Sequence, residues 1–174
     1  EEAAALCLKV GMRDCKELRE ATKVDLREKG LSESDLATLA KLSLVLPALK
    51  RLTLYEPSGS AGPDGLPRLA EGLVAGALPA LADLVLICVR HMGDAGVSAF
   101  AAALDRGALP QLKLLALVHA AIGDTALVAL APALRRRPAL ENLMLCHNPL
   151  SDAGLAALVA PPDGASAGTT GALA

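Results

Sequence analysis

"LPALADLVL" (residues 78–86), "LPQLKLLAL" (109–117) and "RPALENLML" (137–145) are segments of this sequence that superpose without a gap. Each places leucines at the first, fourth and sixth positions of a unit that starts at residue 81, 112 or 140. Two earlier stretches repeat the spacing, and the five sets are Ala21, Val24 and Leu26; Leu49, Leu52 and Leu54; Leu81, Leu84 and Leu86; Leu112, Leu115 and Leu117; and Leu140, Leu143 and Leu145. The sequence therefore contains internal repeats of about 28 to 32 residues, starting near residues 21, 49, 81, 112 and 140.

Behind each later leucine cluster, the spacing of apolar residues changes to that of an amphipathic helix. Intervals of three and four residues place these side chains on one helical face: Val97, Phe100 and Leu104; Leu127, Leu130 and Leu134; and Leu155 and Leu158. Asp94, Asp124 and Asp152 precede these runs, where an Asp side chain can accept from the first N–H groups of a helix. Each unit is predicted to be a short strand followed by a helix, with these Asp residues as helix caps.

The combined pattern, "LxxLxLxxNxL" followed by "xDxGxxxLAxAL", resembles the leucine-rich repeat of the ribonuclease-inhibitor-like type over roughly residues 21–160. The resemblance implies an α/β leucine-rich-repeat solenoid of about five repeats. This solenoid would be a short right-handed horseshoe with parallel strands on its concave face and helices on its convex face. Proteins of that family mostly bind proteins, as inhibitors, innate-immune sensors or activators of small GTPases. We therefore expect a scaffold that binds a protein partner on its concave face, with a GTPase-activator-like regulator as the second hypothesis. No catalytic residue carries over from the family, and we expect a protein that is not an enzyme.

One position departs from the family pattern in most units. The family favours Asn at the ninth position, where its side chain satisfies backbone groups in the turn, but only Asn148 keeps it. The other units have Lys29, Pro57, Val89 and Ala120 there. We expect water or altered geometry to satisfy those turns, and hence looser corners.

The composition supports thin repeated layers. The 174 residues fit one domain and are 53% hydrophobic but only 1% aromatic, with Tyr55 and Phe100 as the aromatic residues. The core must therefore consist of Leu, Ala and Val, which suits a repeat protein better than a single centre built on large rings.

Charge and hydropathy exclude several classes of ligand. The net charge of −2, from 17 basic and 19 acidic residues, provides no basic surface for a nucleic acid. No apolar run approaches the roughly 18 residues of a membrane span, and the acidic start is unlike a signal peptide. We expect a soluble cytoplasmic protein with no cofactor. Since the sequence starts at Glu1 without an initiator Met, we expect a processed chain or part of a longer one.

Four cysteines, Cys7, Cys15, Cys88 and Cys146, are expected to be free thiols in a reducing compartment. If Cys7 and Cys15 share one helix, eight residues separate them by about 12 Å, too far for a disulfide.

Three segments lie outside the regular repeat. Residues 1–20 are predicted to form a helical cap over the first repeat. Residues 55–65, "YEPSGSAGPDG", are predicted to protrude as a mobile loop. Residues 161–174 are too rich in small residues to order themselves and are predicted to be a flexible tail. That tail would leave the last strand edge bare, which invites self-association or indicates that further repeats follow.

Candidate binding residues follow from the second, third, fifth, seventh and eighth positions of each unit, which are expected to project toward the concave face or its rim. These positions are charged in the first two units, whereas the later units place Val85, Ala116 and Met144 in one apolar row and Ile87, Val118 and Cys146 in a second. An exposed apolar patch beside charged residues is typical of a protein-binding surface. The predicted partner-binding residues are Tyr55, Val85, Ile87, Cys88, Ala116, Val118, His119, Met144, Cys146 and His147. The alternative is a nearly flat sheet on which these side chains partly cover one another.

A chemical role for the rim is a further hypothesis. Cys88, His119 and His147 share the eighth position on neighbouring strands about 4.8 Å apart, with Cys146 beside them. Thiolate and imidazole can bind zinc or act as nucleophile and base. No CxxC spacing or enclosing wall accompanies them, and His91 falls out of register, so solvent-facing side chains are the competing interpretation.

Overall fold

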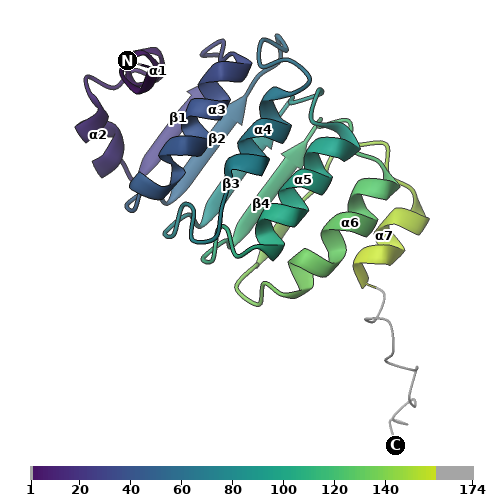
Figure 1. Cartoon of the computed structure of the whole chain (residues 1–174). Helices are drawn as coiled ribbons and strands as arrows, with labels where there is room; N and C mark the ends of the chain where they lie inside the picture. Colours follow the sequence, from purple (N-terminus) through teal and green to yellow (C-terminus); the bar gives the residue numbers. More distant parts are fainter. Residues whose placement is uncertain (1, 160–174) are drawn as a thin grey trace, which may run out of the picture.

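The protein is an α/β structure built on one open parallel sheet. A computed structural model describes residues 2–159. Its strands follow one another across the sheet in chain order (Figure 1). They are β1 (Lys23–Arg27), β2 (Arg51–Tyr55), β3 (Asp83–Ile87), β4 (Leu114–Val118) and β5 (Asn142–Met144).

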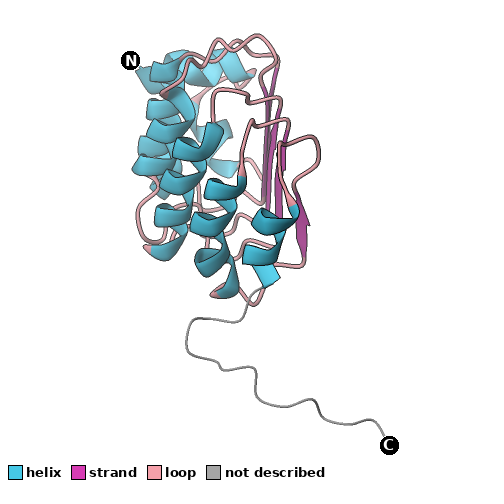
Figure 2. Ribbon diagram, turned by 90° about the vertical axis from the view of Figure 1, so that its right-hand side faces the viewer, coloured by secondary structure: helices cyan, strands magenta, loops and turns pink. Residues whose placement is uncertain are grey.

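Helices connect the strands and pack on one side of the sheet. The helical elements are α1 (Glu2–Val10), α2 (Cys15–Glu20), α3 (Glu33–Leu42), the 3-10 turn η1 (Ser43–Val45), α4 (Gly65–Gly72), α5 (Gly93–Asp105), α6 (Asp124–Arg135) and α7 (Asp152–Val159). Figure 2 shows the helical layer on one side of the strands. The opposite face of the sheet has no helix over it in the described residues. None of the helices within residues 2–159 is long and apolar enough to cross a membrane.

The strand register follows the leucine spacing. Arg51, the third residue of its unit, pairs with Lys23 on one side and with Asp83 on the other. The third residues of the next two units extend this row, since Leu114 pairs with Asp83 on one side and with Asn142 on the other. The predicted parallel strands and the helices between them are therefore confirmed. Leucines at the first, fourth and sixth positions form a continuous core under the helices.

The last repeat is less buried than the others. Leu112, Leu115 and Leu117 are fully buried, whereas the equivalent residues of the last repeat are only partly buried. The reason is that β5 has no strand beyond it among the described residues. The predicted tail, residues 161–174, lies outside the described residues, and self-association through this edge stays a prediction.

The N-terminal cap contains two helices rather than one. Gly11, with φ +90°, ends α1, and its N–H donates to the carbonyl of Leu8. Asp14 then accepts from the N–H of Glu17 and starts α2. The estimate of about 12 Å between Cys7 and Cys15 assumed a single helix, and it is wrong. The two sulfur atoms lie 3.2 Å apart.

The corners between strands and loops are more regular than predicted. The eighth residue of four units has a positive φ between 52° and 59°: Glu28, Cys88, His119 and His147. In the remaining unit, the buried side chain of Glu56 accepts from the N–H of Leu31, 3.2 Å away, and from the hydroxyl of Ser58. Among the described residues, no buried side-chain nitrogen or oxygen atom lacks a partner. The Glu56 carboxylate therefore satisfies a backbone group of the preceding turn, whereas a role for water in the other turns stays a prediction.

Residues 56–64 form a loop with two buried anchor points. Ala61 is buried, as is Glu56, and the N–H of Gly62 donates to the carbonyl of Gly59. Five of these nine residues are exposed, so the segment is a surface loop that is anchored at Glu56 and Ala61, and its predicted mobility stays a prediction.

Asp94 and Asp124 join repeats instead of capping their own helices. Asp94 accepts from the N–H of Gly123, 2.6 Å away, and Asp124 accepts from the N–H of Ser151, 2.9 Å away. The helix-cap prediction is wrong for both residues, because neither α5 nor α6 has a side-chain cap at its N-terminus. Each carboxylate instead satisfies a turn one repeat further along the chain.

Candidate functional site on the open face of the sheet

Two rows of apolar side chains cross the uncovered face of the sheet. In the first row, Val85 pairs with Ala116, which pairs with Met144. In the second row, Ile87 pairs with Val118. Cys146 continues this row beyond the end of β5, since its carbonyl accepts from the N–H of His119 at 3.2 Å. The parallel register therefore brings together residues that lie about 30 positions apart in the sequence.

The members of these rows differ in exposure. Met144 is 46% exposed, whereas Val85, Ile87 and Val118 are partly buried. Ala116 is only 3% exposed, because its short side chain lies between larger neighbours on β3 and β5. A partner placed on the rows would contact the larger side chains, whereas the buried Ala116 would offer it almost no surface.

Leu114 belongs to the same face although it was absent from the predicted site. It is partly buried and occupies the third position of its unit. The equivalent residues in the other units are polar or charged: Lys23, Arg51, Asp83 and Asn142. An apolar residue at a position that is otherwise polar was the signal available in the sequence.

Ion pairs border the apolar rows on the side of β1 and β2. Arg51 lies 2.6 Å from Asp83 on the next strand. Arg27 lies 2.5 Å from Asp25 on its own strand, and hydrogen bonds from this guanidinium hold the pKa of the Asp25 carboxyl below its usual range. Tyr55, partly buried, pairs with Ile87 between the two regions. The face therefore changes from charged to apolar along the sheet.

The histidines at the rim form a stacked pair. The rings of His119 and His147 have their centroids 4.4 Å apart and are inclined by 2°. In this arrangement the ring nitrogens lie in two parallel planes and do not converge on one point. Cys88 is partly buried and Cys146 is exposed. Within residues 2–159, no three His, Cys, Asp or Glu side chains are grouped so that they could hold a metal ion.

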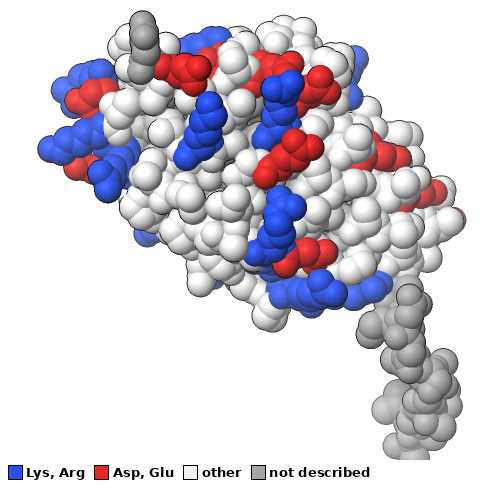
Figure 3. Space-filling view, viewed as in Figure 1, with Lys and Arg blue, Asp and Glu red and all other residues white. Residues whose placement is uncertain are grey.

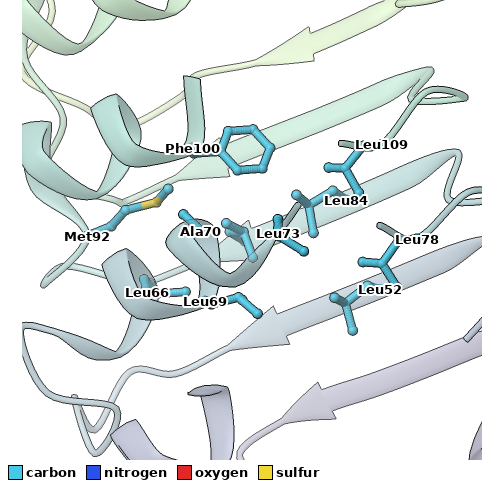
Figure 4. A pocket seen from close by; sticks show the side chains of 11 residues that line it. Leu52, Leu66, Leu69, Ala70, Leu73, Leu78, Leu84, Met92, Phe100 and Leu109 are labelled. Carbon is cyan, nitrogen blue, oxygen red and sulfur yellow. The ribbon is translucent and has the colours of Figure 1, made fainter. Parts of the chain in front are cut away.

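A small apolar cavity lies inside the core, away from the open face. It has a volume of about 20 Å³ and lies between α4, α5 and the strands β2 and β3, with Phe100 and Met92 on one side (Figure 4). All of its lining surface is apolar. A site for a polar substrate needs polar groups that fix its orientation, and this cavity provides none.

The helical face has no area of a single charge. Figure 3 shows acidic and basic side chains interspersed over the helices. Several of them form ion pairs between neighbouring elements, such as Arg68 with Glu33 at 2.5 Å and Arg136 with Asp105 at 2.8 Å. The charges on this face are therefore mixed and partly paired, with no patch of one sign among the described residues that would attract an oppositely charged ligand.

No protein-family model matches the sequence, and no curated protein matches it. The geometry of the open face is therefore the evidence from which a function can be inferred.

Proposed function

We propose that this chain is a leucine-rich-repeat protein of the ribonuclease-inhibitor-like type that binds a protein partner on the open face of its sheet. The observation that carries the binding proposal is the uncovered pair of apolar rows on β3, β4 and β5. Val85, Ile87, Val118 and Met144 leave part of their surface in solvent, although the sheet itself is fixed by the core beneath it.

The repeat assignment is supported by the in-register units and by Asn148. Its Oδ1 accepts from the N–H of Ala120 at 2.9 Å, and its Nδ2 donates to the carbonyl of Leu117 at 2.7 Å. An Asn at this position of the unit therefore satisfies backbone groups of the preceding turn, which is the role that the resemblance assigns to it.

Three properties favour a protein as the partner. The apolar rows form an extended, shallow surface rather than an enclosed pocket, which suits a large partner better than a small molecule. The ion pairs between Arg51 and Asp83 and between Arg27 and Asp25 provide a polar border. Parallel strands with a packed core also keep the face rigid, which lowers the entropy lost on association.

Site-specific photocrosslinking tests the location of binding. A photoreactive amino acid is placed at Val118 in one variant and at Val128 in the other, and each is exposed to the cell extract. Val128 is the matched control, because it is 59% exposed but lies on α6, on the helical side. We expect discrete crosslinked proteins at position 118 and not at position 128. Equal crosslinking at both positions, or none at position 118, would contradict the proposal.

A further inference from the structure

Cys7 and Cys15 lie in contact because of how the chain turns between α1 and α2. The N–H groups of Gly11 and Met12 donate to the carbonyls of Leu8 and Cys7, at 3.1 Å and 2.8 Å. These two bonds and the positive φ of Gly11 form the turn that commonly ends a helix at glycine. The chain reverses direction there, and the thiol of Cys7 donates to the sulfur of Cys15 at 3.2 Å.

The two thiols differ in their access to solvent. Cys15 is exposed and borders a surface hollow that Lys16 and Arg19 also line. Cys7 is fully buried. Burial raises the pKa of the Cys7 thiol to about 11, and the nearby Cys15 sulfur contributes to this increase. A dissolved oxidant therefore reaches Cys15 first, while Cys7 stays protonated behind it.

We propose that Cys7 and Cys15 are a reversible oxidation site, which hydrogen peroxide converts into an intramolecular disulfide. The Cys15 thiolate attacks one peroxide oxygen, the O–O bond breaks, and the released hydroxide takes up a proton to become water. Cys7 then attacks the sulfur of the Cys15 sulfenic acid: the S–S bond forms, the S–O bond breaks, and hydroxide leaves with the Cys7 proton as a second water. The two thiols lose two electrons in total and the peroxide gains them.

The geometry suits this second step. The sulfur atoms need to approach by only about 1.2 Å to reach the length of a disulfide bond. No other pair of cysteine sulfurs in the described residues has a recorded contact of this kind.

The disulfide would fix the cap without touching the proposed binding face. It would join α1 to α2 at the β1 end of the sheet, whereas the apolar rows lie on β3, β4 and β5 toward the other end (Figure 1). The inference therefore stands independently of the proposed partner binding.

Peptide mapping of the whole chain tests the site. The folded protein is treated with hydrogen peroxide at neutral pH, alkylated and cut with trypsin. Lys9 and Arg13 lie between the two cysteines, so trypsin places Cys7 and Cys15 on separate peptides. We expect those peptides to be joined, at a mass lower by two hydrogen atoms, and released by a dithiol reductant. We also expect the pair to form about tenfold faster than any oxidation of Cys88.

Two variants and one comparison complete the test. Cys15→Ser should abolish the joined peptides, and it affects an exposed side chain. Cys88→Ser is the matched control and should leave their yield unchanged. Denatured protein should lose the selectivity for the pair. Accumulation of the sulfinic acid on Cys15 beside an alkylated Cys7 would overturn the inference, as would equal yields of disulfides that include Cys146.

Discussion

Replacing Asn148 with alanine removes the side chain that joins the last two turns of the protein. Its Oδ1 accepts from the N–H of Ala120 at 2.9 Å and from the N–H of Ile122 at 3.4 Å. Its Nδ2 donates to the carbonyls of Leu117 at 2.7 Å and Leu145 at 2.9 Å. Alanine at position 148 makes none of these bonds.

The cost follows from which partners are buried. Ala120 and Ile122 are fully buried, and a buried N–H that loses its acceptor costs about 1–3 kcal/mol. The bond to Ile122 is at the outer limit of length, so its loss contributes less than that of the bond to Ala120. Asn148 itself is partly exposed, so water can reach some of the carbonyls. We expect Asn148→Ala to lower the free energy of unfolding by about 2–4 kcal/mol.

Urea denaturation followed by circular dichroism measures this change, and hydrogen exchange locates it. The amide hydrogens of Ala120 and Ile122 should exchange faster in Asn148→Ala. Asn142→Ala is the matched control, because Asn142 is exposed and its pairing with β4 uses the backbone. The reasoning would be refuted if both variants unfolded at the same urea concentration, or if the two amides kept their protection.

Three further predictions concern contacts between repeats. The pKa of Asp124 is lowered by hydrogen bonds from the hydroxyl and N–H of Ser151, so its stabilising effect is complete at neutral pH and is lost as the pH falls below about 4. Urea titrations over pH should therefore show a smaller acid-dependent loss in Asp124→Asn. Gly154→Ala would place a methyl group against Asp124 Oδ1 and should cost about 1–3 kcal/mol in the same assay. Glu56→Ala would leave the buried N–H of Leu31 without its acceptor and should also cost about 1–3 kcal/mol.

Each of these has a control that isolates its cause. If wild type and Asp124→Asn lose stability in parallel as the pH falls, the hydrogen-bond explanation is wrong. For Gly154→Ala, the double variant with Asp124→Ala should cost less than the sum of the two single variants, and strict additivity would exclude the clash. Glu28→Ala is the control for Glu56→Ala, since Glu28 has an exposed side chain at the same position of its unit. Equal destabilisation by these two variants would contradict the argument.

The sheet could be predicted because every unit has to bury apolar side chains at the same three positions. Leucines at the first, fourth and sixth positions must all reach the core, and a one-residue shift of a strand would turn its buried side chains to solvent. Leu52, Leu84 and Leu115 therefore specify neighbouring strands in a single register, which the structure shows. The apolar rows on the opposite face followed from the same register.

The details that could not be predicted depend on contacts across the fold. Asp94 and Asp124 stand before helical patterns, as helix caps do. The sequence does not show that each carboxylate accepts instead from an N–H group in the turn of the next repeat. The burial of Ala116 depends on larger side chains from two other strands. For Cys7 and Cys15, the regular spacing of apolar residues concealed the break at Gly11, which the glycine itself could have indicated.

The most direct test of partner binding is the dissociation constant of a protein captured at position 118, measured by calorimetry with three versions of the chain. An aspartate at position 118 would place a charge in the second apolar row, so Val118→Asp should weaken binding by about 2 kcal/mol, or about 30-fold. Val128→Asp on the helical side should bind like the unmodified chain, and both variants should retain its melting temperature to within a few degrees. Unchanged affinity of Val118→Asp, with the fold intact, would contradict the proposal that this face binds the partner.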